Sequence, residues 1–153
     1  MAKKRNQIAM SKEEIWPFIE QQKCLQVATI NKDGSPHLTT LFFGVSDETI
    51  IFETFTKSQK IVNLKRDSRI ALLLEDGTVY NELRGITINA IAEVYDDPDK
   101  VQELAKQVII RNHLNISNSD IDEAAKQLAS KRSAVVVRLD KVVSWDHHKL
   151  GNA

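Results

Sequence analysis

The stretch "LRGITINAIAEVY", residues 83–95, carries the strongest β-strand signal in the sequence. Apolar residues occupy every second position of it, namely Ile86, Ile88, Ala90, Ala92 and Val94. The positions between them are mostly polar or small. Successive side chains of a strand point to opposite faces, so this period of two predicts a strand with one face in the core. We therefore expect a fold that rests on β-structure.

Other segments have the composition of strands: residues 25–30, 36–45, 49–55, 69–75 and 134–139. The sequences "NKDG" (31–34) and "DG" (76–77) are typical of the tight turns that join neighbouring antiparallel strands. Six strands with short connections predict a mainly β protein, in which an antiparallel barrel carries a few flanking helices.

The flanking helices are expected to begin at Ser11, Ser58, Pro98 and Ser119. Ser11 followed three residues later by Glu14 has the pattern of a capping box, and proline suits the first position of a helix. A chain of 153 residues is typical of one domain. We expect that domain to span residues 11–150, after a flexible N-terminal arm formed by residues 1–10.

The composition excludes several classes of function. The chain carries 21 Lys and Arg against 21 Asp and Glu, so its net charge is +0. A general nucleic-acid binder normally has a strongly basic face, and no nucleic-acid partner is therefore expected. No stretch approaches the roughly 20 apolar residues of a membrane span. These features predict a cytoplasmic protein without a membrane partner.

Positive charge nevertheless gathers in "TFTKSQKIVNLKRDSRIAL", residues 54–72. Its cations are Lys57, Lys60, Lys65, Arg66 and Arg69, and only Asp67 opposes them. Ser58 heads the predicted helix, whose free N–H groups and dipole favour a bound anion. A lysine in the first turn is unfavourable for that dipole unless an anion compensates it. The spacing leaves two interpretations open, an anion site or a solvated charged helix face, with Arg66 and Arg69 expected at the surface or in ion pairs.

Common catalytic and metal-binding patterns are missing. His147 and His148 are adjacent, so a strand would point them to opposite faces, and no spacing supplies further metal ligands. The sequence contains neither a G-x-S-x-G nucleophile turn nor a P-loop or G-x-G-x-x-G motif. Trp145 lies among polar residues, where it could fill the core or contact a planar ring or a partner subunit.

The motif K-x-x-N-L-x-R-D-x-R is formed here by Lys60, Asn63, Leu64, Arg66, Asp67 and Arg69. With this motif and with "ELRG" (82–85) and "SWDHHKL" (144–150), the chain resembles the pyridoxamine 5'-phosphate oxidase-like split-barrel flavoproteins. The resemblance covers about residues 10 to 150. Together with "KSQK" (57–60), the last two motifs look closer to the branch that uses the deazaflavin coenzyme F(420).

The resemblance implies a homodimer of six-stranded antiparallel split β-barrels, with FMN or coenzyme F(420) in clefts between the subunits. The cofactor's phosphate would meet Ser58 and Lys60, with Lys57 and Asn63 as further contacts. Many relatives carry Arg where Ser58 stands, so the phosphate would depend more on Lys60. The remaining contacts implied are Thr39, Thr40, Leu41, Phe52, Glu53 and Thr54 for the ring, and Tyr80 and Trp145 from the other chain.

The function implied is that of an oxidoreductase that transfers a hydride to or from a small conjugated molecule. Hydride chemistry belongs to the cofactor, so no catalytic side chain and no metal are assigned. Two alternatives remain. One is a non-catalytic flavin or deazaflavin binder, and the other is a protein that holds or degrades haem, with His147 or His148 as a ligand.

Overall fold

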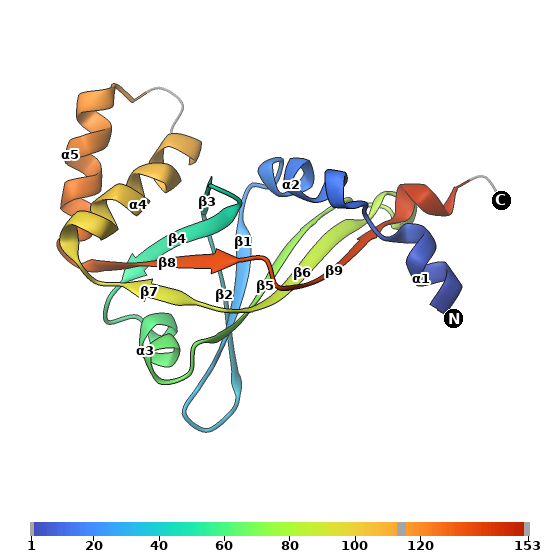
Figure 1. The fold of residues 1–153 in the computed structure, drawn as a ribbon, viewed down its shortest axis with the longest axis horizontal. Coiled ribbons are helices and arrows are strands. Elements are labelled where there is room, and N and C mark those ends of the chain that lie inside the picture. Colours follow the sequence, from blue (N-terminus) through green and yellow to red (C-terminus); the bar gives the residue numbers. More distant parts are fainter. Residues whose placement is uncertain (1, 113–115, 152–153) are drawn as a thin grey trace.

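Two antiparallel sheets form the centre of the protein in the computed structural model, which describes residues 2–112 and 116–151 (Figure 1). The first sheet has the strand order β2-β1-β5-β6-β9 and the second β3-β4-β8-β7. The strands are β1 (Leu25–Ile30), β2 (Pro36–Leu41), β3 (Gly44–Ser46), β4 (Thr49–Phe55), β5 (Arg69–Asp76), β6 (Arg84–Ile91), β7 (Glu93–Tyr95), β8 (Arg132–Arg138) and β9 (Lys141–Asp146). The helices are α1 (Ala2–Ile8), α2 (Lys12–Glu20), α3 (Gln59–Arg66), α4 (Pro98–Asn112) and α5 (Asn118–Ala129), with short 3-10 turns η1 (Tyr80–Glu82) and η2 (His147–Leu150).

The predicted mainly β class and split-barrel architecture are confirmed, and the two sheets are not closed into one continuous barrel. More strands are described than the six expected: the predicted runs 36–45 and 83–95 each divide between the two sheets, and β9 was not predicted as a strand. The stretch 83–95 divides into β6 and β7 at Ala92, whose N–H donates to the Ser68 carbonyl at 2.8 Å. The period of two continues across this transfer, so the sequence pattern does not reveal it.

The main core lies between the two sheets. Phe43 and Phe52 are completely buried there, together with aliphatic side chains from both sheets and from α2. A second apolar cluster forms where α4 packs on the outer face of β4 and β8, through residues such as Ile51, Leu104 and Val136. The helix α5 packs on α4 at one end of the molecule (Figure 1).

Three of the four predicted helix starts are confirmed and one needs correction. Ser58 and Pro98 begin α3 and α4 as expected. The N-cap of α5 is Ser117 rather than Ser119, because the Ser117 hydroxyl accepts the Asp120 N–H at 3.3 Å. Ser11 is the N-cap of α2, but its side chain makes no capping hydrogen bond. The Ser11 side-chain half of the expected capping box is therefore missing, and the Glu14 carboxylate pairs with Lys149 at 2.8 Å.

The N-terminal segment is helical rather than irregular. Residues 2–8 form α1, which contacts η2 and β9. The Met10 N–H donates to the Ser144 hydroxyl at 2.9 Å, so the chain is joined to β9 directly after this helix. The mobility of residues 1–10 stays a prediction. In the described part of the chain, no helix is long and apolar enough to cross a membrane.

Candidate cofactor site

Two open strand edges meet where the predicted ring contacts lie. The strand β2 is the outer strand of its sheet and pairs with β1 alone among the described strands. The short strand β3 pairs only with residues 49–51 of β4, so residues 52–55 have a neighbouring strand on the β8 side only. Backbone N–H and C=O groups along such edges remain available to a ligand. Residues 39–41 and 52–54, which the resemblance assigns to the ring, lie on these two edges.

A hollow of about 410 Å³ lies beside these edges. It is lined by Lys23, Cys24, Thr40, Leu41, Phe42, Glu53 and Arg132. Three of the predicted ring contacts, Thr40, Leu41 and Glu53, therefore come together from two different sheets. The recess thus contains predicted ring contacts from both sheets, and binding of the ring there stays a prediction.

The other three predicted ring contacts are placed differently. Phe52 is completely buried in the main core, so its side chain cannot meet a ligand and only its backbone can. Thr39 lies on the core-facing side of β2, where its hydroxyl is buried without a hydrogen-bond partner among the described residues. Thr54 is half-buried and does not line the hollow. The predicted contact at residue 52 therefore concerns its backbone alone and stays a prediction.

Arg132 is a member of the hollow that the sequence analysis missed. Its Nη1 lies 2.9 Å from Oε2 of Glu53, and its guanidinium carbon lies 4.3 Å from the centre of the Phe55 ring. The predicted last strand began at residue 134, and this placed Arg132 outside the sheet. In the structure β8 begins at Arg132, which pairs in register with Phe55. The only local signal was the position of a basic residue next to an apolar strand.

The start of α3 forms the second part of the site. The Ser58 hydroxyl accepts the Ile61 N–H at 3.4 Å and so caps this helix of eight residues. Lys60 is half-buried, and this burial lowers the pKa of its ammonium group. Lys57 lines a second hollow of about 630 Å³ with Phe55, Thr56, Ser130 and Lys131. Neither Lys57 nor Lys60 forms an ion pair within residues 2–112 and 116–151.

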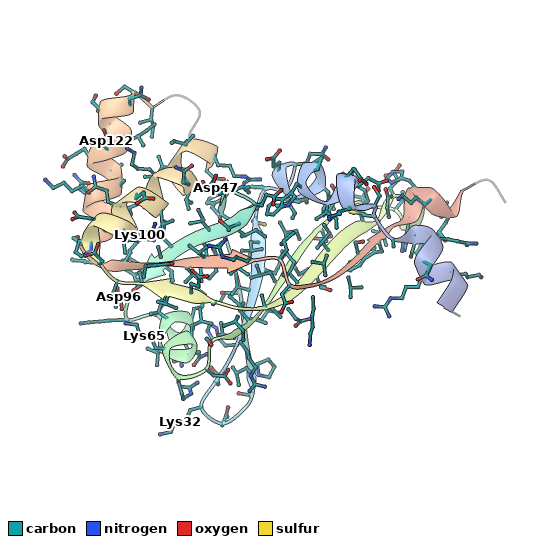
Figure 2. All side chains as sticks on the ribbon, viewed as in Figure 1. Lys32, Asp47, Lys65, Asp96, Lys100 and Asp122 are labelled. Atoms are coloured by element: carbon teal, nitrogen blue, oxygen red, sulfur yellow. The ribbon has the colours of Figure 1, made fainter. Side chains whose placement is uncertain are left out.

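The remaining cations of the 54–72 stretch already have partners. Lys65 pairs with Asp96 at 2.7 Å, and both residues are labelled beside α3 in Figure 2. Arg69 pairs with Asp67 at 2.7 Å, and its hydrogen bonds lower the pKa of the Asp67 carboxyl to about 2. Arg66 donates to the Ile30 carbonyl at 2.6 Å. The surface and ion-pair roles expected for Arg66 and Arg69 agree with this geometry.

Asn63 has a structural role instead of the predicted phosphate contact. It is completely buried, and its amide nitrogen donates to Thr29 Oγ1 at 3.0 Å and to Asn31 Oδ1 at 2.9 Å. Its amide oxygen accepts from Gln59 at 2.8 Å and from Arg66 at 3.0 Å. All of its hydrogen-bonding groups are thus used to hold α3 against the end of β1. We correct the assignment of Asn63 as a cofactor contact.

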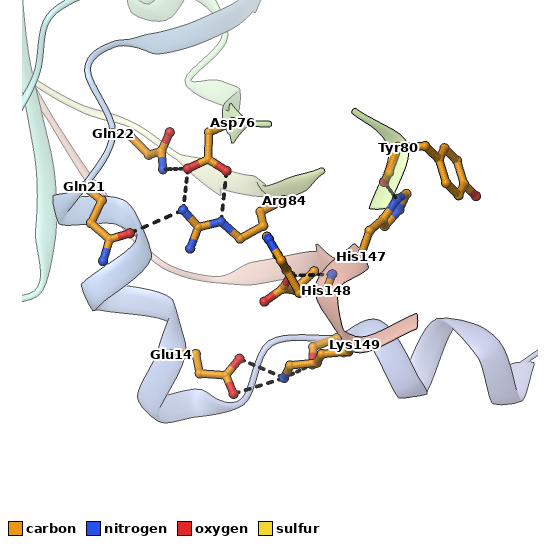
Figure 3. A network of polar contacts seen from close by, with 11 residues as sticks. Glu14, Gln21, Gln22, Asp76, Tyr80, Arg84, His147, His148 and Lys149 are labelled. Carbon is orange, nitrogen blue, oxygen red and sulfur yellow. Dashed lines mark hydrogen bonds and ion pairs between the residues drawn. The ribbon is translucent and has the colours of Figure 1, made fainter. Parts of the chain in front are cut away.

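Neither Tyr80 nor Trp145 lines the hollow of the same chain. Tyr80 follows β5 and begins the 3-10 turn η1. Trp145 lies on β9, at the edge of the sheet opposite β2. Tyr80 is 69% exposed, and its ring packs against that of His147 at a tilt of 54° with 4.7 Å between ring centres (Figure 3). Within one chain these residues do not belong to the recess.

The histidines of the C-terminal segment are held by polar contacts of their own. Nδ1 of His147 lies 2.7 Å from the Tyr80 carbonyl, and Nδ1 of His148 lies 2.8 Å from the Asp146 carboxylate (Figure 3). Within the described residues, no group of three His, Cys, Asp or Glu side chains is placed to hold a metal ion.

The sequence profile of the family described as pyridoxamine 5'-phosphate oxidase matches residues 11–146. The chain belongs to this family. A solved structure of similar sequence is that of a conserved hypothetical protein from Mycobacterium tuberculosis. It is 38% identical, the match covers 97% of this chain and 92% of that one, and the TM-score is 0.90. The family resemblance drawn from the sequence is therefore confirmed.

More distant solved structures show the same fold. An F(420) reductase is 20% identical, with a TM-score of 0.64 and coverage of 82% of this chain and 93% of that one. The haem storage protein HutZ of Vibrio cholerae is 17% identical, with a TM-score of 0.67 and coverage of 87% and 94%. No curated protein matches the chain. At these identities the two likenesses establish the split-barrel fold.

Proposed function

We propose that this chain is an oxidoreductase that binds FMN or the deazaflavin coenzyme F(420) and transfers a hydride to or from a small conjugated molecule. Family membership supports a flavin-type cofactor, and the likeness to an F(420) reductase supports the deazaflavin. No side chain is assigned as catalytic, because the cofactor supplies the hydride chemistry when it is bound. The protein's contribution is to bind the cofactor, to orient it and to shield it from solvent.

The observation that carries the proposal is the state of Lys60. Buried cations are normally paired, yet this half-buried ammonium has no carboxylate partner among the described residues. It lies in the first turn of α3, where a cation also opposes the helix dipole. A phosphate bound there would pair with the ammonium group and offset the unfavourable interaction with the dipole. It would also accept hydrogen bonds from the free N–H groups of the helix start. Ser58 and Lys57 would complete its contacts.

The recess beside the two open edges fits the ring of the same cofactor. Residues 39–41 of β2 and 52–54 of β4 would direct free backbone groups toward the polar edge of the ring. The buried Thr39 hydroxyl, which has no hydrogen-bond partner among the described residues, would gain one if the edge closed around a ligand. The Glu53–Arg132 pair would lie in the wall beside the ring.

A homodimer is part of the proposal. Leu38 is 68% exposed and Ile91 60% exposed, and the strand register places both on the outer face of the five-stranded sheet. Exposed apolar residues gathered on one face of a protein mark an interaction surface. A second copy on this face would bring its Tyr80 or Trp145 toward the recess, which neither residue reaches within its own chain.

The test is an equilibrium titration of the full chain with FMN and, separately, with coenzyme F(420). A charge-assisted phosphate contact is worth about 1.5–3 kcal/mol, so Lys60→Ala should weaken binding tenfold or more. Lys65→Ala is the matched control, because Lys65 lies on the same helix but pairs with Asp96. Equal affinities of wild type and Lys60→Ala would refute the phosphate site.

Haem binding is the second candidate, favoured by the likeness to HutZ. His147 and His148 are the histidines that could serve as ligands, although both make polar contacts within the chain. The visible spectrum of the purified protein after incubation with each cofactor separates the candidates. A Soret band that is lost in a His147→Ala, His148→Ala double variant would favour haem.

A further inference from the structure

The guanidinium group of Arg132 is held in a fixed orientation in the wall of the 410 Å³ hollow. The ion pair of 2.9 Å with Glu53 fixes one edge of the group, and the Phe55 ring covers one face at 4.3 Å. The side chains of Arg132 and Glu53 are 25% and 11% exposed, so solvent screens this pair less than a surface pair. The group is therefore ordered before any ligand arrives.

Most of the hydrogen-bonding capacity of this guanidinium is unused. An arginine side chain carries five N–H donors. Among the described residues, only its Nη1 makes a hydrogen bond, to Glu53. The planar fork of an arginine matches a carboxylate, which it can bind through two parallel hydrogen bonds. The free donors suit a second carboxylate from a ligand.

The charge and the lining of the hollow favour an anion with an apolar body. Lys23 and Arg132 contribute two positive charges and Glu53 one negative charge, which leaves one net positive charge in the lining. The other lining residues are uncharged, and Leu41 and Phe42 are apolar. A small molecule with a carboxylate and a flat, conjugated apolar part would match this combination.

We infer that Arg132 binds the carboxylate of the substrate and so selects conjugated carboxylic acids. This inference rests on the proposed function, because it places the acid beside the ring site. The anion is distinct from the cofactor's phosphate, which is assigned to Ser58 and Lys60 at the start of α3. Glu53 holds the guanidinium in place, and Phe55 keeps it flat against the strand.

The experiment compares two probes that share the same conjugated body but differ in charge. Cinnamate carries a carboxylate, and cinnamamide has the same conjugated body with a neutral amide. The full chain, loaded with whichever of FMN and coenzyme F(420) it binds, is titrated with each probe and followed by NMR. Wild type is expected to bind cinnamate at least tenfold more tightly than cinnamamide, and Arg132→Ala is expected to abolish this preference.

Arg138→Ala is the matched control. Arg138 lies on the same strand and also pairs with a glutamate, Glu93 at 3.3 Å, but it is not part of this hollow. It should leave the preference for cinnamate unchanged. Arg132→Lys, which keeps the charge without the fork, should retain part of the preference and guards against a folding defect in the alanine variant. The inference is overturned if wild type binds both probes equally, or if Arg132→Ala keeps the preference.

Cofactor titrations of the same variants separate this inference from the proposed function. Arg132→Ala should lower the affinity for FMN or coenzyme F(420) much less than Lys60→Ala does, since the cofactor's phosphate is assigned to Lys60 and the target of Arg132 is the substrate. A loss of cofactor affinity without loss of the cinnamate preference would assign Arg132 to the cofactor and overturn the inference. If neither cofactor binds, the proposed function fails, while the probe titration of the cofactor-free chain still tests Arg132.

Discussion

The indole of Trp145 lies directly over Gly85, its register partner on the neighbouring strand β6. A Cβ atom at residue 85 would overlap the benzene part of the indole, so only glycine permits this contact. The contact holds the aromatic side chain flat against the outer face of the five-stranded sheet. Trp145 is thus fixed on the surface where a second copy of the chain is proposed to lie.

Gly85→Ala should destabilise the protein by about 1–3 kcal/mol, because the added methyl group overpacks the contact. In a Trp145→Ala background the same change should cost less than about 0.5 kcal/mol, since the indole that it meets is gone. Urea unfolding of the wild type, the two single variants and the double variant measures the coupling free energy between Gly85 and Trp145. Equal costs in the two backgrounds would mean that the indole does not occupy this position.

Trp145 should report on cofactor binding through its fluorescence. Trp16 packs against the main core, so it serves as the internal comparison. If a second copy brings Trp145 toward the ring, quenching during a cofactor titration should survive in Trp16→Phe and shrink markedly in Trp145→Phe. Equal quenching in the two variants would place Trp145 away from the ring and remove it from the site.

Leu38→Lys should convert a dimer into monomers, because it puts a charge on the exposed apolar face of the five-stranded sheet. Ile110→Lys is the control, since Ile110 is also exposed but lies on α4. Light scattering at micromolar concentration measures the mass of each variant. The wild type should be dimeric, and cofactor affinity should fall together with dimerisation. A monomeric wild type with tight cofactor binding contradicts the homodimer.

The Asp67–Arg69 pair should contribute to stability in a pH-dependent way. The hydrogen bonds from Arg69 lower the pKa of Asp67 from 3.8 in an unstructured chain to about 2 in the folded protein. A lowered folded pKa gives a contribution that is present above about pH 4 and is lost as the pH falls toward about 2. The stability difference between wild type and Asp67→Asn should shrink over this range in urea unfolding. A difference that stays constant from pH 6 to pH 2 would show that the pair does not contribute.

The sequence alone determined the features that depend on neighbouring residues. The alternation in 83–95 predicted a strand because side-chain direction follows the local backbone. The starts of α3 and α4 were predicted because a cap or a first-turn proline acts within one turn of the helix. The sequence also located the basic stretch 54–72 and, by family resemblance, the strands that form the recess.

Only the tertiary structure decided which of these residues are free to bind a ligand. Lys65 is neutralised by Asp96, whereas Lys60 has no such partner among the described residues, and no local pattern distinguishes the two lysines. Arg132 pairs with Glu53, which lies 79 positions earlier in the chain, because β4 and β8 are neighbours in the second sheet. Ion pairing and burial depend on strand order, and strand order is set by the packing of the whole core rather than by any one segment.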